Sequence, residues 1–437
     1  MKTGATLAAG AALAGNLPLD AWAGAPPRAL VFIMLDGGND SFNMLVPRSG
    51  ADHRVYARTR ANLALDRSAL LPLSGYRDDQ GREFGLHPAM ADVQNLFQKQ
   101  QLSFVANVGP MVRPLTRDEF YTGQVPLPLG LLSHADQFRH WLTARPLERT
   151  QRGWFGRLAD HHQPRLKAGA IPMNISLAGN NILQRGQRAV PYSITDNGSV
   201  GLAFRADASP LNRNLARALE MDASQEADPF KSTYVSLIEK AQRRHRTFSK
   251  ALSRVRVPTP FDNTPLAQQL KMAARAIQAG PDLGHGVQTF FIRYIGWDHH
   301  DELLNNHQRM LSVVSRALGQ FQRALDAMGT RSGVVTFTGS DFGRTLTSNG
   351  NGTDHGWGGH ILVMGDAIRG GRIAGRYPHL ELGAGNPLDA GDGVIIPTTP
   401  TDHVFAELAQ WAGMPQEDLG ELFPGLAQLG PSKLNLI

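Results

Sequence analysis

The sequence contains no cysteine among its 437 residues. Disulfide bonds, thiolate metal ligands and a cysteine nucleophile are therefore all excluded. Long apolar runs are also lacking, because no segment reaches the roughly 18 uninterrupted apolar residues that a membrane-spanning helix needs. Basic residues outnumber acidic residues by only 44 to 38, and they are not gathered into a stripe with aromatic residues. The composition therefore argues against a nucleic-acid-binding protein.

The densest basic run lies between Lys240 and Arg256. Its basic residues recur at helical spacing, which is typical of one face of a long surface helix. We interpret this run as a solvated helix face in preference to a site for a partner.

The first 23 residues resemble an export signal. Lys2 is followed by an apolar run from Ala5 to Leu17, and Ala21-Trp22-Ala23 gives a small-x-small cleavage pattern before Gly24. The opening residues are similar to the part of a twin-arginine signal that follows its Arg-Arg pair. We therefore expect a periplasmic or extracellular protein exported by the twin-arginine route, which predicts in-frame Arg-Arg codons upstream of Met1. A chain that folds before export would have no need of disulfide bonds.

Apolar runs of strand length alternate with helical patterns along the rest of the chain. The expected strands cover residues 29–35, 102–108, 170–176, 286–295, 334–338 and 360–364. Alternation of this kind predicts an α/β fold with a doubly wound, mainly parallel sheet. With 42% hydrophobic residues the chain can bury a large core, and we expect one domain over residues 24–437. Residues from about 190 to 285 are expected to form a helical insertion in it.

Acidic residues and histidines follow several of the expected strands directly. Because parallel strands end at the same edge of a sheet, we expect these side chains to lie together there. Carboxylate and imidazole groups are the donors that zinc, manganese and magnesium accept. The alternative for each short cluster is an ordinary turn or a solvated loop. The pattern predicts a site for one or two divalent ions, with the ligands Asp36, Asp298, His300, Asp341 and His355.

Ser133 stands at the start of an expected amphipathic helix. The commoner use of a serine at this position is to cap the helix. The free amides and dipole of the helix would also stabilise an alkoxide or phosphoester there, so Ser133 is the best-placed nucleophile in the chain. Both roles remain open from the sequence.

Six short motifs together resemble a family of secreted bacterial proteins, domain of unknown function 1501, within the alkaline phosphatase-like superfamily. They are Leu-Asp-Gly-Gly-Asn-Asp at 35–40, Leu-His-Pro at 86–88, Ser-His-Ala-Asp-Gln at 133–137, Gly-Trp-Phe-Gly-Arg at 153–157, Trp-Asp-His-His at 297–300 and Thr-Asp-His-Gly at 353–356. The resemblance covers nearly all of the chain after residue 23. It implies an alkaline phosphatase-like fold in which metals activate a serine or threonine that attacks phosphate or sulfate esters.

Roles for individual residues follow from this resemblance. Asp36 and Asp341 would hold one metal ion together with the Ser133 alkoxide. Arg344 would pair with the ester oxygens. The second metal ion would be held by the remaining three predicted ligands, Asp298, His300 and His355.

One position departs from the superfamily pattern, which usually has a histidine directly after the acid that Asp341 matches. This chain has Phe342 there, so the first metal site is weakened, lost or rebuilt from Asp40 or His360. Formylglycine-dependent sulfatase chemistry is not expected, since cysteine and a Ser-x-Pro-x-Arg motif are absent.

The leading hypothesis is an exported metal-dependent hydrolase of phosphate or related esters, acting on a small ester or a cell-envelope component. The alternative, which Phe342 favours, is a non-catalytic relative that binds a metal and a cell-envelope partner or glycan.

Overall fold

The computed structural model describes residues 27–162, 170–201, 209–210, 213–214 and 228–437. The expected export signal, residues 1–23, lies outside the described residues. Among the helices that are described, none combines the length and the apolar character needed to cross a bilayer.

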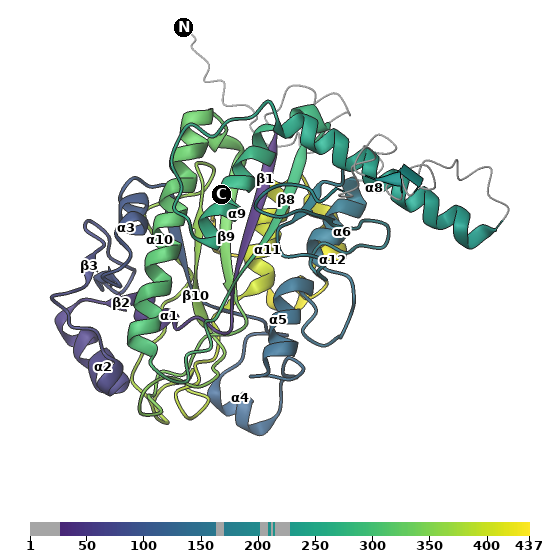
Figure 1. Ribbon diagram of the computed structural model, residues 1–437. Helices are drawn as coiled ribbons and strands as arrows, with labels where there is room; N and C mark the ends of the chain where they lie inside the picture. The colour runs from purple at the N-terminus through teal and green to yellow at the C-terminus, as the bar shows by residue number, and fades with distance from the viewer. Residues whose placement is uncertain (1–26, 163–169, 202–208, 211–212, 215–227) are drawn as a thin grey trace, which may run out of the picture.

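Strand β1 (Arg28–Asp36) lies in the middle of the main sheet, between β8 (Val287–Ile295) and β9 (Val334–Ser340) (Figure 1). Both pairings are parallel, and Phe32 of β1 lies opposite Phe291 and Phe337. All three strands therefore end at the same edge of the sheet.

The rest of the main sheet extends on both sides of these three strands. On the β9 side, β10 (Gly359–Met364) runs antiparallel between β9 and β5 (Leu102–Gly109), and β11 (Ile373–Ala374) and β12 (Thr399–Pro400) pair with β5. On the β8 side lie β6 (Asn174–Ser176) and β7 (Tyr192–Ser193). The predicted α/β fold with a mainly parallel sheet is confirmed, with β10 as an antiparallel member.

The sheet is covered on both faces, and β1 shows why. Its alternate residues Ala29, Val31, Ile33 and Leu35 belong to one buried apolar cluster, whereas the intervening Leu30, Phe32 and Met34 belong to another. A strand buried on both faces reads as a continuous apolar run, which is why the run was recognisable in the sequence.

The helices divide between these two apolar clusters. The first cluster contains residues of α3 (Ala91–Gln98), α9 (Pro265–Gln278) and α10 (Leu303–Met328). The second contains residues of α5 (His134–Thr143), α6 (Trp154–His162), α11 (Thr401–Trp411) and α12 (Leu419–Leu422). The expected helical insertion contains α9 and the long helix α8 (Pro229–Leu252), whose outer end extends beyond the rest of the molecule (Figure 1).

The segment after β1 is more ordered than its sequence suggested. It contains α2 (Gly50–Arg60) and β3 (Leu71–Pro72), which were not among the expected elements. A small antiparallel sheet joins β3 to β4 (Phe84–Leu86) and β2 (Leu45–Pro47). Arg60 of the polar helix α2 is buried in an ion pair with Asp40, a contact between separate segments that sequence periodicity does not show. The remaining short helices are α1 (Ser41–Met44), α4 (Arg117–Thr122) and α13 (Leu426–Leu429).

Candidate metal centre

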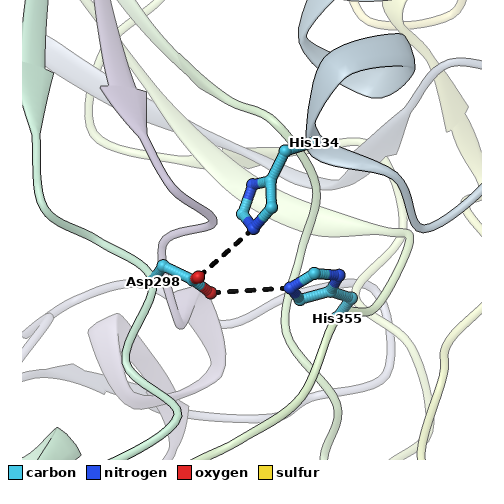
Figure 2. A group of neighbouring side chains, drawn as sticks. All are labelled: His134, Asp298 and His355. Atoms are coloured by element: carbon cyan, nitrogen blue, oxygen red, sulfur yellow. Dashed lines mark ion pairs between the residues drawn. The ribbon is translucent and has the colours of Figure 1, made fainter.

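Three separate segments meet at the carboxyl edge of the sheet, where β1, β8 and β9 end. Asp298 and His300 lie in the loop after β8, and His355 lies in the loop between β9 and β10. His134 is the first residue of α5 and follows the N-cap residue Ser133. Figure 2 shows His134 and His355 directed at the carboxylate of Asp298 from two sides. The sheet therefore fixes the places from which these side chains reach a common point.

The donor atoms of His134, Asp298 and His355 all lie within 4.8 Å of one another, which is close enough for them to bind one ion, and His300 lies next to two of them. The Asp298 carboxylate lies 3.3 Å from Nε2 of His134, 3.0 Å from Nε2 of His300 and 3.6 Å from Nε2 of His355. Nε2 of His300 and Nε2 of His355 are 3.1 Å apart. Ligands about 2.0–2.1 Å from a tetrahedral zinc ion are roughly 3.3 Å from one another. The observed spacings bracket that value.

Each of the three imidazoles is held at its other nitrogen. The oxygen atoms that contact Nδ1 are Asp341 Oδ2 for His134 at 2.7 Å, Asp354 Oδ1 for His300 at 2.9 Å, and the carbonyl oxygen of Leu132 for His355 at 2.8 Å. An oxygen acceptor at Nδ1 places the proton on that atom and leaves the lone pair on Nε2. Carboxylate or carbonyl partners of this kind are the usual outer shell of metal-binding histidines.

The carbonyl that holds His355 comes from a strained residue. Leu132 has a φ of 70°, in the left-handed region that residues other than glycine rarely adopt. It lies in a tight turn in which the Ser133 N–H donates to the carbonyl of Gly130. The turn directs the Leu132 carbonyl at His355 and starts the helix that carries His134. One local conformation therefore orients two of the imidazoles.

Burial and neighbouring groups shift the pKa values of the side chains at the centre, some upward and some downward. The hydrogen bond that His134 donates to Asp341 raises the pKa of His134. Burial raises the pKa of Asp341 itself, and burial lowers the pKa of His355. Burial would also raise the pKa of Asp298, but the ion pair with Arg344 outweighs it and the net pKa is lowered. Asp298 is therefore ionised at neutral pH, and His134 holds a proton more readily than His355 does.

The centre is open to solvent. The exposed fraction of the side chain is 34% for His134, 43% for His300, 28% for His355 and 42% for Asp298. A ligand can therefore reach these side chains from outside.

The two predicted catalytic residues lie at or beside the centre. Ser133 is adjacent in sequence to His134, and its side chain makes no hydrogen bond that caps α5. Arg344 is fully buried, and its guanidinium donates to Asp298, to the Gly37 carbonyl and to Thr353. Arg344 thus contacts a predicted ligand directly.

The structure brings together only part of the predicted ligand set. Asp298 and His355 lie in one group with His134, His300 contacts both Asp298 and His355, and Asp341 contacts the centre through His134. Asp36 instead accepts hydrogen bonds from the guanidinium of Arg293.

Asp40 and His360, from which the first metal site was expected to be rebuilt, make other contacts. Asp40 lies in the fully buried ion pair with Arg60. His360 accepts a hydrogen bond from the Asn107 N–H at Nδ1, and its ring stacks on Tyr377. Burial lowers the pKa of His360 to about 3, so its imidazole is neutral.

The sequence profile of a family described as "Protein of unknown function (DUF1501)" matches residues 27–390. The chain belongs to this family. A comparison with curated proteins gave no match.

Solved structures that are similar to this chain include three proteins with different names. PsFucS1 sulfatase from Pseudoalteromonas sp. is 12% identical, with 91% of this chain and 70% of that chain covered and a TM-score of 0.35. The lipoteichoic acid synthase LtaP from Listeria monocytogenes is 8% identical, with 85% and 74% covered and a TM-score of 0.32. The periplasmic domain of EcEptC from Escherichia coli, in complex with Zn, is 11% identical, with 78% and 74% covered and a TM-score of 0.30. We draw no functional conclusion from similarity at this level.

His134 is the residue of this DUF1501 chain that sequence reasoning missed. Its position after Ser133 was attributed to the first turn of a helix, although the Ser-His-Ala-Asp-Gln motif contained the signal. Phe342 was taken as a departure that weakens a metal site. In the structure its ring packs against His134 and His355, with centroid distances of 4.7 and 4.6 Å. Phe342 therefore forms an apolar wall beside two of the imidazoles.

Proposed function

We propose that the chain is a hydrolase of phosphate or related (sulfate) esters that depends on a divalent metal ion. The ion would be held by His134, Asp298 and His355, whose donor atoms all lie within 4.8 Å of one another, with His300, 3.1 Å from His355, as a fourth ligand. The observation that carries this proposal is the convergence of three imidazoles, each anchored at Nδ1, on one ionised carboxylate.

The donor set fits a divalent ion on chemical grounds. Three Nε2 lone pairs and a carboxylate would repel one another in the absence of a cation. Neutral imidazoles together with a carboxylate are donors that zinc accepts, and manganese is a second candidate. Arg344 offsets part of the charge on Asp298, but it approaches from the buried side. The Nε2 atoms therefore still require a proton or a metal ion between them.

A bound divalent ion would polarise the ester and lower the pKa of a coordinated water. The chain's own residues would supply the rest of the chemistry. Asp341, Asp354 and the Leu132 carbonyl fix the tautomers of the imidazoles. Arg344 keeps Asp298 ionised and in place. Ser133, whose hydroxyl makes no capping bond, is assigned as the nucleophile.

We also propose that the protein is exported and that its substrate is a small ester or a component of the cell envelope. This part rests on the signal-like first 23 residues. The open position of the metal centre suits a substrate that is part of a larger molecule.

The test combines metal content with turnover. The purified protein is loaded with zinc or manganese, analysed for bound metal, and assayed with p-nitrophenyl phosphate, bis-p-nitrophenyl phosphate and p-nitrophenyl sulfate. The wild type should bind metal and hydrolyse at least one ester. His134→Ala with His355→Ala should lose both properties, while the control His161→Ala should keep them, because His161 lies on α6 near Asp418. Retention of metal and full turnover by the double variant would sink the proposal.

Ser133→Ala separates two versions of the mechanism. If Ser133 is the nucleophile, this variant should bind metal normally and lose turnover. Unchanged turnover would transfer the attack to water and remove Ser133 from the mechanism.

A second candidate function is metal-dependent binding without catalysis. The observation in its favour is that arginines already engage two predicted carboxylates, Arg293 at Asp36 and Arg344 at Asp298. Such a protein would bind metal through the same four residues and hydrolyse none of the three esters. Its partner would be a cell-envelope component or glycan.

A further inference from the structure

Helix α8 (Pro229–Leu252) is buried at one end and exposed at the other. Near its C-terminus, Phe248, Ala251 and Leu252 are buried, and the Phe248 ring packs edge-on against Tyr192. Its N-terminal half extends away from the molecule (Figure 1). This end carries apolar side chains that the described chain leaves exposed.

The exposed apolar residues continue the stripe by which α8 packs on the core. Phe230 and Phe248 are 18 residues apart, which is five turns of an α-helix, so they lie on the same face. Tyr234 and Leu237 follow Phe230 at i+4 and i+7 and share that face. Phe230 is 88% exposed, Tyr234 is 64% exposed and Leu237 is 60% exposed. Three large apolar side chains in a row with this much exposure indicate a surface that something else covers.

The charged residues of α8 are mostly basic, and four of the six basic residues lie in its inner half. Within α8 the only acidic residue is Glu239, against six basic residues: Lys231, Lys240, Arg243, Arg244, Arg246 and Lys250. Lys231 and Lys240 lie on opposite flanks of the apolar stripe, roughly 90° from its centre. Helices that lie in a membrane interface combine an apolar face bearing Phe or Leu with a polar face rich in Lys and Arg.

We propose that the outer half of α8 binds the surface of an anionic lipid bilayer. Phe230, Tyr234 and Leu237 enter the headgroup region. Lys231 and Lys240 contact lipid phosphates from both sides of the stripe, and the other basic residues add long-range attraction. From the sequence, we interpret the basic run that starts at Lys240 as a solvated helix face. In this proposal the basic residues flank an apolar stripe that enters the bilayer.

A second copy of the chain fits this surface less well. A stable interface buries about 800 Å² on each partner, whereas three side chains of this size offer about 500 Å². Two α8 helices brought together would also oppose their basic surfaces. An anionic bilayer has the complementary charge and needs no matching shape.

Vesicle flotation with the full chain tests the proposal, using phosphatidylcholine alone and phosphatidylcholine mixed with phosphatidylglycerol. The wild type should bind the mixed vesicles and be released by salt. Phe230→Ser with Tyr234→Ser and Leu237→Ser should weaken this binding about tenfold or more, and Lys231→Glu with Lys240→Glu should do the same. The control, Leu147→Ser with Val190→Ser, removes two other exposed apolar side chains and should bind as the wild type does.

The contact of single residues with the bilayer can be measured with a fluorescent label on an introduced cysteine, because the chain has no cysteine of its own. A polarity-sensitive fluorophore on Phe230→Cys should report an apolar environment when mixed vesicles are added. The same label on Arg246→Cys, on the polar face, should not.

Several results would overturn the proposal. One is the absence of wild-type binding to the mixed vesicles. Another is equal binding by the wild type and the triple serine variant. A third is a concentration-dependent dimer that the triple variant loses, since the stripe would then belong to a second copy of the chain.

Discussion

The interaction between Asp341 and His134 sets the proton balance of the centre. Asp341 is buried, and its Oδ2 lies 2.7 Å from Nδ1 of His134. This hydrogen bond raises the pKa of His134, so the metal-free imidazole holds a proton at a higher pH than an ordinary histidine. A metal ion must displace that proton before Nε2 can bind it.

Zinc binding at a pH near the raised pKa of His134 should therefore release up to about one proton from this residue. The affinity should rise with pH through that pKa and fall as the imidazole becomes protonated below it. Asp341→Asn removes the partner that raises the pKa, so fewer protons should be released, and loss of the orienting contact should weaken zinc binding about 10–100-fold. Calorimetry in two buffers of different ionisation enthalpy measures both quantities.

Asp282→Asn is the matched control, because Asp282 forms an ion pair with Arg254 at the surface. It should leave proton release and affinity unchanged. Equal behaviour of Asp341→Asn and the control would show that Asp341 has no influence on the centre.

The sequence predicted the kinds of residue at the centre better than their partners. Asp298 and His300 follow β8, His355 lies in the loop between β9 and β10, and the structure places the three side chains close together. Which carboxylates meet an arginine was not predictable, because Arg293 lies 257 residues from Asp36. His134 was missed for a similar reason, since its contact with Asp341 spans 207 residues.

At the scale of elements, the turn after β1 positions the loop after β8. Gly37 has a φ of 123°, and a Cβ added there would lie 2.6 Å from the backbone nitrogen of Asp298 and 2.9 Å from that of Trp297. The carbonyl of Asp36 accepts hydrogen bonds from Gly296 and Trp297 at the same place. The two loops are thus in backbone contact next to the metal centre.

Gly37→Ala should displace the loop that carries Asp298. We expect a loss of about 2–4 kcal/mol in the free energy of unfolding, together with weaker zinc binding, because backbone strain and a backbone clash act at once. Gly284→Ala is the control: its φ of 77° imposes similar strain, but no atom lies within 4 Å of an added Cβ. It should cost about 1–2 kcal/mol and leave zinc binding intact. Urea unfolding and zinc titration of both variants give the comparison, and equal zinc affinity in the two would contradict the positioning role.

Long buried elements were predictable from the sequence, and short ones were not. β1 shows a continuous apolar run and was expected within one residue of its observed bounds. Strands β2, β3 and β4 have three residues or fewer, which is too short to show an alternating pattern. The antiparallel direction of β10 depends on the loop between residues 341 and 358, whose path is set by tertiary contacts. Among these contacts is the one between the Gly343 N–H and the Trp357 carbonyl.

On the scale of the whole molecule, the proposed ligands belong to segments far apart in the chain. His134 is the first residue of α5, Asp298 and His300 follow β8, and His355 precedes β10. A bound ion would join these three segments at one edge of the sheet. Because the unfolded chain does not hold them together, the ion would bind the folded state and stabilise it.

Removal of the metal should therefore lower the thermal stability of the protein. At a free zinc concentration of 100 times Kd, binding contributes about 2.7 kcal/mol, which for a chain of this length corresponds to a Tm difference of about 3 °C. A chelator should produce this decrease in the wild type, and the variant with His134→Ala and His355→Ala should show none. Differential scanning calorimetry at fixed protein and zinc concentrations measures the shift. A chelator-independent Tm in the wild type would mean that the four residues hold no ion under these conditions, and both the hydrolase and the metal-dependent binding protein would then be excluded.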